Sequence, residues 1–254
     1  AAASGQIAFC RGGAILMLDV ATGGAVAIVF PALAQGIASP AAADIDPSFD
    51  ILNAAVTAKG ERLLFRMTAR GPAGAAAPAA HGKTAGSDVY AYVWPTGLDS
   101  AVAGFEPGQG ILALAATAHP DFDDTPLYDE NGDGDKVNDG AIWHSHWVVL
   151  TPDEACGPGA LKVKDIPAGA TPSLPKTWPG LPILLDSPGF AVHPAGDTIE
   201  VTAPATAGAA GAAYDGVTAA LRVNGDMAAP LLCVVRVHDV ASGNLSLPGK
   251  IDAQ

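Results

Sequence analysis

Basic residues are scarce in this sequence. It has 13 Lys and Arg against 26 Asp and Glu, which gives a formal net charge of −13. A surface that binds a nucleic-acid backbone needs clustered Lys and Arg, so the composition argues against a nucleic-acid partner and suits a protein that attracts cations. Long hydrophobic runs are also missing. No run reaches about 18 uninterrupted apolar residues, so the sequence predicts no membrane-spanning helix.

The familiar catalytic motifs are missing as well. The chain has no G-x-S-x-G, no P-loop, and no G-x-G-x-x-G between a strand and a helix. These absences favour a non-catalytic protein. An enzyme, such as a metal-dependent hydrolase, would have to work through a bound metal ion that keeps water on an open coordination position.

Cysteine is rare, and Cys10, Cys156 and Cys233 are the only three. No C-x-x-C occurs, which excludes a zinc ribbon and a thioredoxin motif. The N-terminus, AAASGQ, has no initiator Met and resembles the product of signal-peptide cleavage, so we expect a periplasmic or secreted protein. In such a compartment three cysteines allow one disulfide and one free thiol, and the sequence does not choose the pair.

Short apolar segments, separated by Gly- and Pro-rich turns, make up most of the chain, and no convincing long amphipathic helix occurs. This pattern predicts an all-β fold, namely an antiparallel β-sandwich with long irregular loops. We expect one domain over 1–254, with N-terminal strands and a linker in 1–45 and the main sandwich in 46–254. The predicted strands are 6–10, 14–19, 25–30, 49–57, 62–68, 88–94, 110–119, 141–150, 198–203, 217–223 and 231–239.

An acidic segment, DENGDGDKVND, covers residues 129–139. Oxygen-bearing side chains alternate there around a glycine turn, an arrangement that can wrap a hard cation. The segment overlaps the start of an EF-hand loop but has Gly140 in place of the closing Glu. We predict that calcium orders this long connection, and a solvated acidic turn is the alternative. The predicted ligands are Asp129, Asn131, Asp133, Asp135, Asn138 and Asp139.

A second metal-binding pattern, WHSHW, follows directly at 143–147. Side chains alternate along a strand, so His144 and His146 point to the same side and can present two imidazoles to one ion. If the strands before and after the acidic segment form an antiparallel hairpin, His119 lies near them. The three histidines would then bind copper, zinc or iron, or would only hydrogen-bond to nearby acceptors. A carboxylate ligand would come from Asp121, Asp123 or Asp124.

Three aromatic side chains, Tyr90, Tyr92 and Trp94, share one face of the strand predicted at 88–94. Such a stripe either packs in a core or offers a stacking surface to a sugar or a planar cofactor. We expect core packing. A carbohydrate-binding or surface-assembly module that uses these three rings is an alternative.

Residues 46–68, DPSFDILNAAVTAKGERLLFRMT, and the following DVYAYVW at 88–94 resemble the opening of DOMON and related family 9 carbohydrate-binding-like domains. The resemblance implies a β-sandwich that binds haem or a sugar. Haem-binding members use a Met and a His as axial ligands, which the resemblance places at Met67 and His238. A haem-binding electron-transfer domain is therefore a further alternative.

The function that these patterns favour is that of an exported, non-catalytic, metal-binding β-sandwich. Its ligands would be calcium in the acidic segment and a transition metal at the three histidines. A sugar or another protein would be a further partner.

Overall fold

The computed structural model describes residues 6–11, 14–19, 25–28 and 36–253, in two compact units, Ala1–Gly36 and Ile37–Gln254. The first unit contains an antiparallel sheet in the order β1-β2-β3. Its strands are β1 (Gln6–Arg11), β2 (Ala14–Asp19) and β3 (Ala25–Ile28), at the positions that the sequence predicts. Residues 1–5, on which the signal-peptide prediction depends, lie outside the described residues.

The larger sheet of the second unit closes on itself. Its strands follow the order β10-β16-β15-β7-β8-β9, and β10 pairs with both β16 and β9, so six antiparallel strands form a barrel. The all-β prediction is confirmed, whereas the predicted sandwich is not, because the sheet is a barrel and not an open layer. The barrel strands are β7 (Asp88–Pro95), β8 (Ile111–Ala118), β9 (His144–Pro152), β10 (Leu161–Val163), β15 (Val217–Val223) and β16 (Leu232–Val240).

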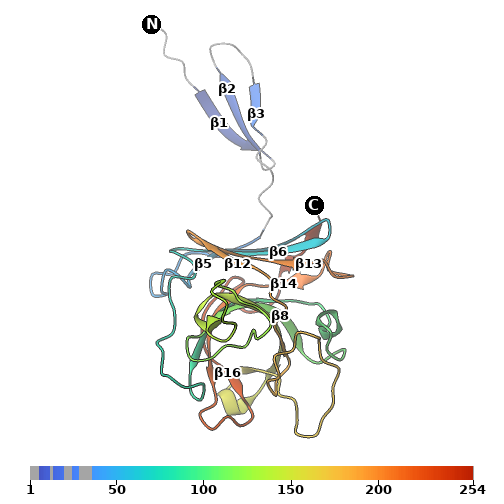
Figure 1. Ribbon diagram of the computed structural model, residues 1–254. Helices are drawn as coiled ribbons and strands as arrows, with labels where there is room; N and C mark the ends of the chain where they lie inside the picture. Colours follow the sequence, from blue (N-terminus) through green and yellow to red (C-terminus); the bar gives the residue numbers. More distant parts are fainter. Residues whose placement is uncertain (1–5, 12–13, 20–24, 29–35, 254) are drawn as a thin grey trace. The chain divides into compact units, whose positions relative to one another are not determined.

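A second sheet covers one side of the barrel (Figure 1). Its order is β12-β13-β6-β5-β18; β4 pairs with β5, and β18 runs parallel to β5. The strands are β4 (Ile37–Ala38), β5 (Ile51–Lys59), β6 (Arg62–Ala69), β12 (Val192–Ala195), β13 (Thr198–Pro204) and β18 (Asp252–Ala253). The smaller elements are β11 (Leu185–Asp186), which pairs with β9, the pair β14 (Ala213–Tyr214) and β17 (Gly249–Lys250), and the 3₁₀ turns η1 (Ser100–Ala103), η2 (Asp139–Ala141) and η3 (Glu154–Cys156).

Strand alternation divides the apolar residues of the barrel between two cores. On β7, Tyr92 and Trp94 face the second sheet, where they pack among residues of β5, β6 and β13. The opposite face of β7, with Val89, Ala91 and Val93, points into the barrel. The expected core packing of the aromatic stripe is therefore correct for Tyr92 and Trp94. No helix in the described part of the chain is long and apolar enough to cross a membrane.

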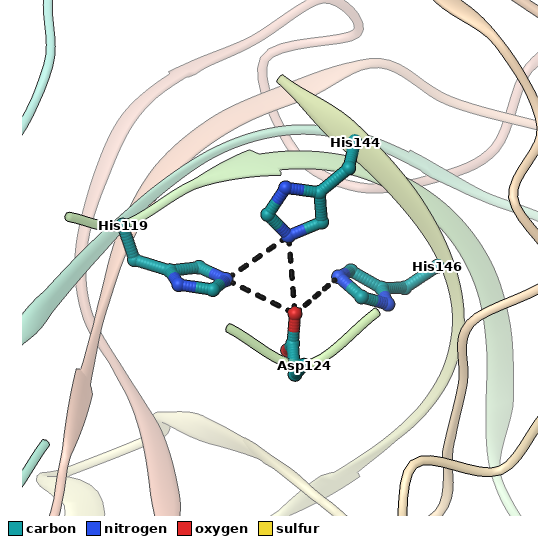
Figure 2. A group of neighbouring side chains, drawn as sticks. All are labelled: His119, Asp124, His144 and His146. Atoms are coloured by element: carbon teal, nitrogen blue, oxygen red, sulfur yellow. Dashed lines mark hydrogen bonds and ion pairs between the residues drawn. The ribbon is translucent and has the colours of Figure 1, made fainter. Parts of the chain in front are cut away.

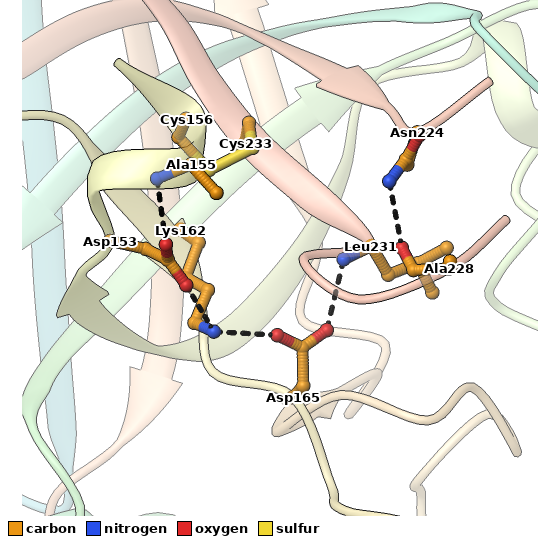
Figure 3. Close-up of a disulfide and its surroundings, with 9 residues drawn as sticks. All are labelled: Asp153, Ala155, Cys156, Lys162, Asp165, Asn224, Ala228, Leu231 and Cys233. Atoms are coloured by element: carbon orange, nitrogen blue, oxygen red, sulfur yellow. Dashed lines mark hydrogen bonds and ion pairs between the residues drawn. A yellow bond between two sulfur atoms is a disulfide. The ribbon is translucent and has the colours of Figure 1, made fainter. Parts of the chain in front are cut away.

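A disulfide joins Cys156, at the end of η3, to Cys233 of β16 (Figure 3). It lies beside the strand that closes the barrel, because Lys162 of β10 pairs with Cys233 in register. The same lysine bridges two carboxylates, with Nζ 2.6 Å from Asp153 and 2.8 Å from Asp165. The third cysteine, Cys10, is in β1, whose side chains lie outside the described residues.

Candidate metal centre

The β8–β9 hairpin brings three histidines together inside the barrel. The two strands are antiparallel, and their register pairs Thr117 with His144 and Ala115 with His146. His119 follows the last residue of β8, and its backbone N–H donates to Gly140 O at 2.7 Å. The predicted hairpin and the predicted common side of His144 and His146 are thus both present in the structure.

Four side chains converge at one point (Figure 2). Asp124 Oδ1 lies 3.3 Å from His119 Nε2, 3.1 Å from His144 Nε2 and 3.3 Å from His146 Nε2. The Nε2 atoms of His119 and His144 are 3.0 Å apart. All four residues are at most 5% exposed, so the group is shielded from bulk water.

Hydrogen bonds on the far side of each ring fix the tautomers. His119 Nδ1 is 2.9 Å from Phe122 O and His144 Nδ1 is 2.6 Å from Ile142 O; because a carbonyl only accepts, both nitrogens donate. His146 Nδ1 is 3.1 Å from the hydroxyl of Ser187, which gives its own hydrogen to a backbone carbonyl and therefore accepts. Each neutral imidazole consequently aims an Nε2 lone pair at the centre of the group.

Hydrogen bonds at Asp124 and at the preceding residue, Asp123, fix the loop that directs the Asp124 side chain toward the histidines. Its backbone carbonyl accepts from Ser187 Oγ at 2.6 Å. The preceding carboxylate, Asp123, accepts from the N–H of Thr125 at 2.7 Å and from that of Asp139 at 2.9 Å. The sequence left three aspartates open as the fourth member, and the structure selects Asp124. Asp121 instead accepts from the backbone N–H groups of residues 81 and 82.

Burial and mutual attraction compete in setting the pKa values of the group. Burial opposes the Asp124 carboxylate, but the imidazoles of His146 and His119 outweigh burial and hold the pKa of Asp124 well below its usual range. Burial also disfavours a charged His144, yet the adjacent Asp124 carboxylate outweighs burial and raises the pKa of that ring. Burial lowers the pKa of His146.

The acidic segment 129–139 uses most of its carboxylates on its own backbone. Asp129 accepts from the N–H groups of residues 132, 133 and 134. Asp133 accepts from the N–H of Asp135 and from the side-chain amides of Asn131 and Asn138. All of these residues are exposed or half-exposed. Of the six predicted calcium ligands, only Asp139 belongs to a group of carboxylates that could hold an ion.

That group, which sequence reasoning missed, consists of Asp123, Glu130 and Asp139. Asp139 is fully buried; its Oδ2 accepts from Glu130 N at 2.8 Å, whereas its Oδ1 has no hydrogen-bond partner. Both carboxylate oxygens of Glu130 are buried without a partner, and burial raises the pKa of Glu130. Glu130 is the only glutamate between residues 118 and 150, a signal that could have drawn attention to it.

The remaining predicted site residues do not meet at a ligand site. Met67 is fully buried in the core beneath the second sheet, and the ring of His238 stacks on Phe49 with centroids 4.4 Å apart. Tyr92 and Trp94 are 0% exposed, so neither ring can stack on a sugar. Tyr90 is half-buried and packs edge-on against Phe49.

Together the fold and the group define a six-stranded β-barrel with a buried cluster of three histidines and one aspartate. No family model, no curated protein and no solved structure matches the chain in the comparisons made. The case for a function therefore depends on the geometry of the site.

Proposed function

We propose that the protein binds a transition-metal ion through His119, Asp124, His144 and His146. One observation carries this proposal: in a buried place, the Nε2 atoms of three histidines lie 3.1–3.3 Å from one carboxylate oxygen, and all four ligand atoms lie within 4.8 Å of one another. Asp124 Oδ1 and His146 Nε2 have no hydrogen-bond partner there. A cation at the centre would be coordinated by all four ligand atoms, the three Nε2 nitrogens and Asp124 Oδ1. The hydrogen bonds that the rings make through Nδ1 are of the kind that orients histidine ligands.

The spacing favours zinc over copper. Ligands about 2.0–2.1 Å from zinc at tetrahedral angles are about 3.3 Å apart, close to the distances in this group. In a square-planar copper site each ligand has another directly across the metal, at about 4 Å. Asp124 Oδ1 lies within 3.3 Å of all three nitrogens, so no ligand stands across from it. Iron with additional ligands is the remaining competitor.

Metal analysis and titration test the proposal. The purified protein should bind about one equivalent of Zn²⁺ or Co²⁺, and bound Co²⁺ should show the strong visible absorption of a tetrahedral site. Asp124→Asn and His146→Gln should each weaken binding at least ten-fold. His193→Gln, at an exposed position of β12, is the matched control and should bind like the original protein. Failure of the unaltered protein to bind either ion would refute the proposal.

A hard divalent cation such as calcium has a better candidate site than the one predicted from the sequence. We propose Asp123, Glu130 and Asp139, because three carboxylates lie together and both buried oxygens of Glu130 and Oδ1 of Asp139 lack hydrogen-bond partners. Hard cations prefer oxygen ligands, and an ion here would neutralise charges that burial otherwise penalises. It would also brace the loop that presents Asp124, since Asp123 is the adjacent residue.

Terbium luminescence and calcium competition distinguish the two acidic sites. Asp139→Asn and Glu130→Gln should each reduce Tb³⁺ affinity at least ten-fold. Asp135→Asn, in the exposed part of the segment, should change it little. The reverse pattern would favour the calcium ligands predicted from the sequence. If the unaltered protein binds no Tb³⁺, both proposed acidic sites are refuted.

Export to the periplasm or the extracellular space is part of the proposal, and the Cys156–Cys233 disulfide supports it because such bonds persist in oxidising compartments. A non-catalytic role likewise remains our proposal. The resemblance to DOMON domains stays a prediction, and so do its haem and sugar ligands. A Soret band in the purified protein would favour haem.

A further inference from the structure

The barrel is hollow beside the histidine cluster. Its interior contains a cavity of about 90 Å³, lined by inward-facing side chains of all six barrel strands. Small side chains leave this space open: Ala219 of β15 pairs with Ala91 of β7, and Ala115 of β8 pairs with His146 of β9. Most of the lining is apolar. Its polar residues are Thr84, Thr117, His119, Asp124 and His146.

The cavity reaches the proposed metal from one side only. His119, Asp124 and His146 line it, whereas His144 does not. In a tetrahedral site these three ligands form the face opposite His144. A further donor atom that approaches along the cavity would therefore meet the metal through this face, and zinc can expand to five ligands.

Charge selects the kind of donor. A divalent ion with Asp124 and three neutral imidazoles leaves a net charge of +1 in a buried, apolar place. Among the described residues that line the cavity, none is a Lys or Arg, and Asp124 has the one carboxylate. A single negative charge on the incoming ligand would neutralise the centre, whereas a neutral or doubly charged group would leave a buried charge without a partner.

The shape of the cavity selects the rest of the ligand. The lining on β7 extends from Val89 to Pro95, which is about 20 Å along a strand. A small volume over this length suits an unbranched chain better than a ring system. Apolar cavities of this kind exclude water and accept hydrocarbon.

Two lining residues mark places where the cavity meets solvent. Met227 and Leu245 line it and are 44% and 38% exposed. Both have positive φ, 59° and 55°, a conformation that costs energy for residues other than glycine. Apolar side chains held in this way at a cavity edge are consistent with an entrance for an apolar chain.

We infer that the barrel binds a linear, monoanionic amphiphile of the fatty-acid type. The carboxylate coordinates the metal through the face formed by His119, Asp124 and His146, and the alkyl chain lies along the apolar interior. This inference rests on the metal centre proposed above and gives it a ligand class.

A chain-length series tests the inference without any substitution. Co²⁺-loaded protein is titrated with acetate, butanoate, hexanoate and octanoate while its visible absorption is followed, with octan-1-ol as the uncharged control. Each added methylene should tighten binding about four-fold until the cavity is filled. Octan-1-ol should bind much more weakly than octanoate. Equal affinities for acetate and octanoate would overturn the inference but leave the metal centre intact, whereas failure to load Co²⁺ or Zn²⁺ would count against the centre itself.

Filling the cavity provides an independent test. Ala219→Leu adds bulk on β15, a strand that carries none of the metal ligands, and Ala115→Leu adds it beside His146; each should weaken octanoate binding at least ten-fold. The Co²⁺ spectrum and acetate binding should be retained with Ala219→Leu. Ala195→Leu, at an exposed position of β12, is the matched control. Unchanged octanoate affinity in a correctly folded, Co²⁺-loaded Ala219→Leu protein would refute the placement of the chain.

Discussion

Gly140 is the residue on which the geometry of the metal centre depends most closely. A Cβ at this position would lie 1.8 Å from Phe122 O and 2.6 Å from His119 O. Both contacts are with backbone on either side of the turn that carries His119 and Asp124, so neither can be relieved by a rotamer change. We expect Gly140→Ala to displace these ligands and to weaken zinc binding at least ten-fold in a calorimetric titration.

Gly225→Ala is the matched control, because a Cβ there meets nothing within 4 Å. It should bind zinc like the original protein. If Gly140→Ala also does so, the turn is not held in the position described. In the sequence, Gly140 is notable because it occupies the position of the closing glutamate of an EF-hand loop. The structure gives a different reason for glycine here, since only a residue without a side chain fits against residues 119–122.

Tyr92 should make the free energy of unfolding fall at alkaline pH. Burial raises the pKa of Tyr92 from 10.0 to about 12. Because the folded-state pKa is above the unfolded one, the stabilisation is complete below pH 10 and is lost as the pH rises towards 12. The loss should be about 2–3 kcal/mol in the free energy of unfolding, measured by denaturant titration.

Tyr92→Phe should flatten this alkaline slope. It should also lower stability at neutral pH, because Tyr92 Oη donates to Ser48 O at 2.6 Å and accepts from Gly74 N at 2.8 Å, and Gly74 N would be left unpaired. A variant with the same slope as the original protein would show that another group controls the alkaline transition.

The histidines could be predicted from sequence, whereas their carboxylate partner could not. Alternation along a strand places His144 and His146 on one side whatever the rest of the fold does. Asp124 lies in a loop, and its direction depends on contacts made by Ser187 and Asp139, which are distant along the chain. For the same reason, the carboxylates of 129–139 could not be assigned between cation binding and hydrogen bonding to their own backbone.

At the scale of elements, strand positions were predictable but the closure of the barrel was not. The interval 217–223 is the same in prediction and structure, and the other long predicted strands differ only at their ends. Closure depends on β10, which has three residues and lies between 150 and 198, where the sequence predicts no strand. A strand this short has no detectable period, so its two pairings appear only in the folded chain.

The disulfide should stabilise this closure. Cys156 and Cys233 are separated by 77 residues, for which the chain-entropy model gives about 4–5 kcal/mol. The double variant Cys156→Ala/Cys233→Ala should lose a stabilisation of this order in urea titration. It should still bind zinc, because the ligands belong to β8, β9 and their connecting loop. A loss of zinc binding under native conditions would mean that β8 and β9 keep their positions only when the barrel is closed at β10.

At the scale of the whole molecule, the proposed metal would link the β8–β9 hairpin to the loop that Asp124 belongs to, and both form part of the barrel. Binding to the folded state alone should therefore raise global stability: free zinc at about 100 times its dissociation constant should add about 2.7 kcal/mol. For a unit of this size we expect the melting temperature to rise by about 5–10 °C in calorimetry, and a chelator to reverse the rise. Asp124→Asn, whose zinc affinity should be at least ten-fold lower, should gain no more than about 1.4 kcal/mol at the same zinc concentration and so show at most about half of this rise. A rise in that variant as large as in the original protein would place the stabilising ion elsewhere in the molecule, because the cluster in the variant lacks its only carboxylate.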